Sequence, residues 1–200
     1  MAAKKERSNS SMGVIAMFVA LIVLAAWAFI SPSFLMKSIE AERTFAIGWG
    51  GQASDRWIYT QTLASSMDYL KSSASSIKDT QALPRAIRGW TQERILTTWL
   101  WLSLITYRGF MLLLYFFILF PLVIALSMDG WGVREISTHR FSSQSPMKHR
   151  FGVVISNLTL IGVAIWLALP FPIPSVVAPL AIIAVGFSSW MWLSNMQKRI

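Results

Sequence analysis

Four long stretches without a charged side chain constrain this chain more than any other feature. They cover residues 12–30, 110–127, 151–169 and 175–193. About 20 apolar residues in a helix cross the hydrocarbon core of a bilayer and satisfy their own backbone hydrogen bonds there. The chain is 54% hydrophobic and 14% charged, whereas a soluble domain carries about 25% charged residues. The sequence therefore predicts an all-α polytopic membrane protein with four transmembrane helices.

The segment that joins the last two stretches, residues 170–174, contains Pro170, Pro172 and Pro174. Proline lacks a backbone N–H and cannot continue a helix, so we expect a tight turn here. Because the turn is short, the two helices beside it should pack against each other. Small residues spaced by four mark candidate contacts between helices. They are Ala16 and Ala20, Gly152 and Ser156, and Ala184 and Ser188.

Lysines and arginines near the ends of the stretches predict the orientation, because basic loops stay in the cytoplasm. They lie in residues 1–11 (Lys4, Lys5, Arg7), 128–150 (Arg134, Arg140, Lys148, Arg150) and 194–200 (Lys198, Arg199). We therefore expect both termini and the loop 128–150 inside, with residues 31–94 and the turn 170–174 outside. A cleaved signal peptide is the alternative for residues 12–30, since Ala26-Trp27-Ala28 resembles a cleavage site.

The outer segment, residues 31–94, is expected to hold two or three short helices. Gly48 and the pair Gly50-Gly51 should break a helix that arrives from residue 34. Apolar residues then recur at helical spacing and predict one buried face of an amphipathic helix. That face comprises Tyr59, Leu63, Met67, Leu70, Ala74 and Ile77.

Residues for catalysis or for binding a metal are scarce. The two histidines, His139 and His149, lie in a basic loop, and the chain has no cysteine. A zinc site needs more ligands at closer spacing, so solvated histidines are favoured over a metal site. The expected stretches contain no carboxylate, and a proton or ion pathway through them would lack its usual residues. We predict no catalytic residue, no metal and no cofactor.

Arg108 is an ionisable residue whose depth in the membrane has two interpretations. The apolar segment 95–109 before the second stretch contains Trp99 and Trp101. Either it extends the membrane helix and carries Arg108 into the bilayer, or it lies at the interface and Arg108 reaches the headgroups. In both cases the cation needs a carboxylate, a carbonyl or a lipid headgroup. In the loop 128–150, Asp129-Gly130 predicts a turn and Trp131 is expected at the headgroups.

The order of these motifs resembles a known family. They are Tyr107-Arg108-Gly109-Phe110, Pro121 in an aromatic stretch, Asp129-Gly130, Arg134-Glu135-Ile136, Arg140-Phe141, His149-Arg150 and the proline-rich turn. Together they resemble the TraJ-like inner-membrane proteins of conjugative plasmids and integrating conjugative elements, which are associated with the type IV coupling protein. The resemblance covers residues 95–200 in motifs and the whole chain in topology.

This resemblance implies a non-enzymatic accessory subunit of conjugative DNA transfer in the bacterial inner membrane, with residues 31–94 in the periplasm. Its expected partner is the transmembrane region of the coupling ATPase at a type IV secretion system. Other inner-membrane components of that system and anionic lipids are expected as further contacts. No direct contact with nucleic acid is expected. Candidate partner-binding residues are Arg108, Asp129, Trp131, Arg134, Glu135 and Arg140. The alternative is an independent transporter or membrane enzyme, which would need more polar residues within its helices.

Overall fold

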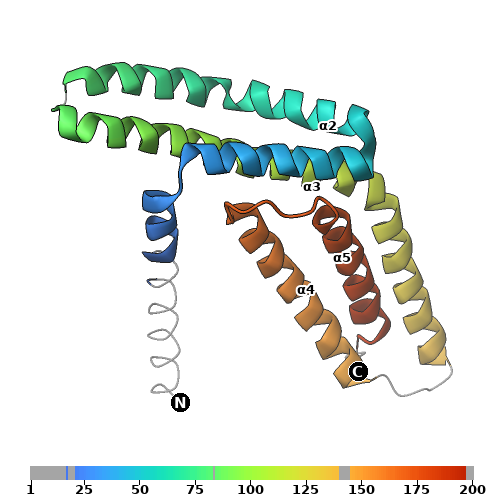
Figure 1. Ribbon diagram of the computed structural model, residues 1–200. Helices are drawn as coiled ribbons and strands as arrows, with labels where there is room; N and C mark the ends of the chain where they lie inside the picture. Colours follow the sequence, from blue (N-terminus) through green and yellow to red (C-terminus); the bar gives the residue numbers. More distant parts are fainter. Residues whose placement is uncertain (1–16, 18–20, 83, 140–144, 197–200) are drawn as a thin grey trace, which may run out of the picture. The chain divides into compact units, whose positions relative to one another are not determined.

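A computed structural model describes residues 17, 21–82, 84–139 and 145–196, and this part of the chain is helical without strands (Figure 1). A helical segment, Leu21–Phe29, is followed by α2 (Pro32–Asp79), a 3-10 turn (Thr80–Ala82) and α3 (Arg85–His139). Two shorter helices complete this part, α4 (Pro146–Ala168) and α5 (Val177–Ser194). The predicted all-α class is confirmed.

Three helices, α3, α4 and α5, are long and apolar enough to cross a membrane. A fourth span results if Leu21–Phe29 and the following helix count as one, but these two are bent by 100°. The expected stretches 110–127, 151–169 and 175–193 coincide with these three helices. Residues 12–16 and 18–20 of the first stretch, including Ala16 and Ala20, lie outside the described residues.

The helix α2 begins with a side-chain cap, because the Ser31 hydroxyl accepts a hydrogen bond from the Phe34 amide at 3.3 Å and Pro32 occupies the first turn. The expected break is confirmed at Gly51, whose φ of 78° favours glycine. The expected separate helices correspond to the two halves of α2, which meet at this kink, and to the first residues of α3.

The predicted buried face of α2 is wrong. Leu63, Met67 and Leu70 are exposed, whereas the buried positions of this stretch are Asp55, Ile58, Thr62 and Ser66. Apolar spacing identifies a buried face only when the other side meets water. Here Asp55 accepts a hydrogen bond from the Tyr107 hydroxyl of α3, and the hydroxyls of Thr62 and Ser66 donate to carbonyls of α2 itself, so these polar side chains are satisfied on the buried side.

The helix α3 runs without a break through residues 95–109 and through the predicted turn at Asp129-Gly130. The turn prediction is therefore wrong. Gly130 instead lies at a close contact between α3 and α5. A Cβ atom on Gly130 would lie 2.8 Å from the carbonyl oxygen of Trp190 in α5. Gly130 therefore lets α5 approach the backbone of α3.

The described residues divide into two compact units. Unit 1 comprises Met1–Lys37 and Met67–Leu102, and unit 2 comprises Ser38–Ser66 and Ser103–Ile200. The core of unit 2 gathers side chains from α2, α3, α4 and α5, namely Ala46, Ile58, Tyr107, Met111, Trp166 and Ala178.

The packing of α4 against α5 is confirmed, as is the contact through Gly152 and Ser188. A Cβ atom on Gly152 would lie 2.8 Å from the Trp192 nitrogen and 3.0 Å from the Ser188 oxygen. The proline-rich connection is non-helical as expected, but it extends over residues 169–176. It is longer than a tight turn because its backbone groups bond to side chains of α2 and α3.

Candidate functional site: a buried arginine that joins three helices

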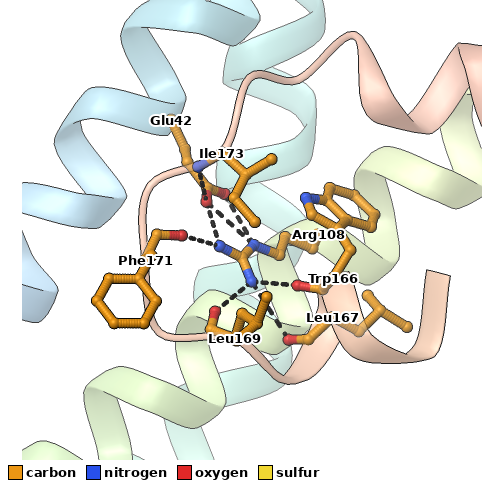
Figure 2. Close-up of polar contacts among 7 residues, drawn as sticks. All are labelled: Glu42, Arg108, Trp166, Leu167, Leu169, Phe171 and Ile173. Carbon is orange, nitrogen blue, oxygen red and sulfur yellow. Dashed lines mark hydrogen bonds and ion pairs between the residues drawn. The ribbon is translucent and has the colours of Figure 1, made fainter. Parts of the chain in front are cut away.

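Arg108 is a residue of unit 2 with 0% of its surface exposed. Figure 2 shows its polar contacts. Its Nε donates to both carboxylate oxygens of Glu42 at 3.1 Å, and its Nη2 donates to Glu42 Oε1. Glu42 comes from α2 and is itself 1% exposed. Arg108 is therefore buried, and a carboxylate of the same chain neutralises its charge.

The remaining N–H groups of Arg108 bond to the end of α4 and the connection that follows. Nη1 donates to the carbonyls of Trp166, Leu167 and Leu169, and Nη2 donates to the Phe171 carbonyl at 2.6 Å. The last four carbonyls of a helix have no partner within it, and a cation at this end also interacts favourably with the helix dipole. Arg108 thus caps the C-terminal end of α4.

Glu42 completes the arrangement by accepting a hydrogen bond from the Ile173 amide at 3.1 Å (Figure 2). Its carboxylate therefore holds the α4–α5 connection directly, while Arg108 holds the same connection through its carbonyls. The Arg108 guanidinium also lies 5.6 Å from the centre of the Trp166 ring. We call Glu42, Arg108 and the backbone of residues 166–173 the arginine clamp.

The contacts of the arginine clamp stabilise the packing of the helices. A guanidinium keeps its proton in proteins, and its planar fork suits several acceptors at once. An unpaired charge at membrane depth costs at least ~2.5 kcal/mol, and the carboxylate and carbonyls around Arg108 remove that cost. The clamp therefore holds three helices together and leaves no N–H of its arginine aimed at a substrate.

A second polar group lies beside the clamp. Asp55 accepts hydrogen bonds from Arg43 Nη2 at 2.8 Å and from the Tyr107 hydroxyl at 2.9 Å. The hydrogen bond to Asp55 raises the pKa of Arg43 above its ordinary value, so Arg43 stays charged. Arg43 and Asp55 lie on opposite sides of the kink at Gly51, and their ion pair fixes the angle between the two halves of α2.

Unit 1 uses an arginine in the same way. Arg94 Nη1 donates to the Trp27 carbonyl near the end of the helical segment Leu21–Phe29. The Thr97 hydroxyl donates to the Ile30 carbonyl at 3.5 Å, and Trp27 Nε1 donates to the Thr98 hydroxyl at 2.8 Å. Side chains of α3 therefore cap this helix end and hold the bend before α2.

Four other candidate partner-binding residues, Asp129, Trp131, Arg134 and Glu135, lie at a distance from the clamp. Asp129 follows Arg108 by 21 residues on α3, which is roughly 31 Å of helix. Its Oδ2 accepts a hydrogen bond from Trp190 Nε1 of α5 at 2.7 Å. The structure therefore separates Arg108 from these four candidates and assigns it bonds within its own chain.

Beyond Asp129, the last part of α3 presents accessible side chains. Trp131 is 55% exposed, and the Arg134 guanidinium lies 5.1 Å from the centre of its ring. Glu135 is exposed and lies 3.6 Å from His139. We call residues 131–139 the α3 extension. The remaining candidate, Arg140, lies outside the described residues.

Glu42, Asp55 and Arg94 were not predicted as site residues. Both acids lie outside the expected membrane stretches, where carboxylates are common. No spacing rule could pair Glu42 with Arg108, because 66 positions separate them. The sequence offered one indication of such an acid. A buried cation such as Arg108 requires an acid somewhere in the chain or in a partner.

Comparisons with known proteins bear on the function. No curated protein and no solved structure matches the chain. A family model described as "IncC plasmid conjugative DNA transfer protein DtrJ-like" matches residues 53–197. The expected link to conjugation is confirmed, and the match does not specify the TraJ-like group that the motifs resemble. The chain belongs to the DtrJ-like family of conjugative DNA transfer proteins.

Proposed function

We propose that this protein is a non-enzymatic inner-membrane subunit of the conjugation machinery, and that it packs against the transmembrane region of the type IV coupling ATPase. The family gives the role in conjugative DNA transfer. The α3 extension is the observation that favours a partner. It projects an exposed tryptophan and an arginine from the end of a membrane helix, and both residue types are enriched at protein interfaces.

The aromatic surface of α3 before the extension supports the same proposal. Phe116, Phe117 and Phe120 are exposed, and their rings contact one another. Membrane helices associate largely by van der Waals packing, and exposed aromatic rings offer a large area for it. A helix of the ATPase that packs along these rings would arrive at Trp131 and Arg134, where headgroups begin. One continuous face of α3 would then serve both contacts.

A charge reversal in the α3 extension tests the partner. We expect Arg134→Glu to lower the amount of ATPase that co-purifies in mild detergent by at least about tenfold, because an acid of the ATPase that pairs with Arg134 would then face a like charge. The frequency of conjugation should fall with it. Lys71→Glu is the matched control, since Lys71 is exposed and its distance to Asp68 of 3.8 Å indicates a weak surface pair. Equal recovery of the ATPase with both variants would contradict the proposal.

The proposed orientation places both termini and the α3 extension in the cytoplasm. Because the chain has no cysteine, single cysteines report the exposed side without background. We expect an impermeant maleimide to label Ser75→Cys and Pro172→Cys in intact cells, and His139→Cys only after permeabilisation. All three side chains are accessible in the structure. Labelling of position 139 in intact cells would contradict the proposed orientation.

A further inference from the structure

We infer that α4 carries a self-association surface centred on Asn157, and that its occupant is a second copy of this chain. Asn157 lies at the middle of Pro146–Ala168, a helix that is long and apolar enough to span the membrane. Its side chain is exposed, and no hydrogen bond to it is found in the part of the chain that the structure describes. The amide therefore faces outward from a membrane-length helix, with no partner in the described part of the chain.

The neighbours of Asn157 show that the amide points away from α5. At 100° per residue, Trp166 lies about 180° around the helix from Asn157, and Gly152 lies about 140° away. Both of these residues are buried, and Gly152 contacts α5. The side of Asn157 carries Val153, Leu160 and Ile161 instead, all exposed. The amide thus lies at the centre of the outward face of α4.

An amide without a hydrogen-bond partner is unfavourable in the hydrocarbon of a membrane. Transfer of an amide without a hydrogen bond into an apolar medium is unfavourable, and asparagine in a membrane helix gains stability by bonding across to another helix. The amide carries both a donor and an acceptor, so it is complementary to a second amide. Asn157 therefore matches a second Asn157.

Depth in the membrane favours a second copy over a different protein. Two copies insert with the same orientation, so a two-fold axis along the membrane normal places both Asn157 side chains at one depth. No other partner meets that condition automatically. Ala164 and Ala168 lie within about 20° of Asn157 around the helix, and such small residues let two helices approach closely.

Oxidative cross-linking in membranes tests this inference with the full chain. A single cysteine at Ala164, with Asn157 intact, should form a disulfide-linked dimer upon oxidation. Leu158→Cys is the matched control, because Leu158 is also exposed but lies about 100° away around the helix. In the Ala164→Cys background, Asn157→Leu should lower the dimerisation constant by about five- to thirtyfold, and Asn157→Gln should retain most of it.

Two further measurements keep the result independent of protein yield and of the ATPase. Copies with two different tags should co-purify when Asn157 is present, in cells that lack the coupling ATPase. Thermal unfolding of Asn157→Leu should match wild type at a dilution where wild type is monomeric, since the side chain makes no bond within the described part of its chain. Equal cross-linking from positions 158 and 164, or a cross-link to another protein in place of the dimer, would overturn the inference.

Discussion

Replacing Arg108 by alanine is expected to lower the free energy of unfolding by about 3–5 kcal/mol, because one partner of a buried ion pair is removed and the other stays buried. Glu42 would then hold an unpaired charge with 1% of its surface exposed. The carbonyls of Trp166, Leu169 and Phe171 would lose their donor as well. Urea unfolding in detergent micelles, followed by tryptophan fluorescence, measures the change.

The variant Arg108→Lys separates the contribution of the positive charge from that of the guanidinium geometry. A single ammonium group has three donors, and it cannot reach Glu42 and three carbonyls on different sides. We therefore expect Arg108→Lys to recover only part of the stability. Glu42→Gln should also destabilise, since it removes the counter-charge of a buried guanidinium. The effects of Arg108→Ala and Glu42→Gln should be non-additive in the double variant Arg108→Ala/Glu42→Gln, because the two side chains are each other's partners.

Arg43→Ala is the control for this series. Arg43 also pairs with a buried acid, but its side chain is 35% exposed, so solvent weakens the pair. We expect a smaller loss of stability than for Arg108. If Arg108→Ala unfolded at the same urea concentration as wild type, the arginine clamp would not hold the helices together.

The membrane class was predictable because a bilayer requires apolar stretches of nearly fixed length. That requirement located α4, α5 and the apolar part of α3 to within a few residues. It also identified Arg108 as a residue in need of acceptors, and the structure supplies a carboxylate and carbonyls. The DtrJ-like match then confirmed the conjugative role that the motif order suggested.

The arrangement outside the membrane stretches was not predictable in the same way. Asp129-Gly130 has the residues of a turn, yet the helix continues, because the contact of Gly130 with Trp190 depends on α5. The face of α2 was misassigned, because its orientation is set by Asp55 and Glu42 bonding to α3. Local spacing contains no information about such long-range partners.

The contact of α4 with α5 gives the second large effect, through Gly152→Val. Its Cβ atom would lie 2.8 Å from the Trp192 nitrogen and 3.2 Å from the Trp192 Cα, so α5 must move as a whole. Overpacking of this kind costs about 1–3 kcal/mol, and no flexible side chain is present to give way. Gly162→Val on the same helix is the matched control, because nothing lies within 4 Å of its added Cβ. Both changes replace glycine by valine and raise helix propensity alike, so a difference in urea midpoint isolates the helix contact. Equal midpoints for the two variants would mean that α4 and α5 are not closely packed at Gly152.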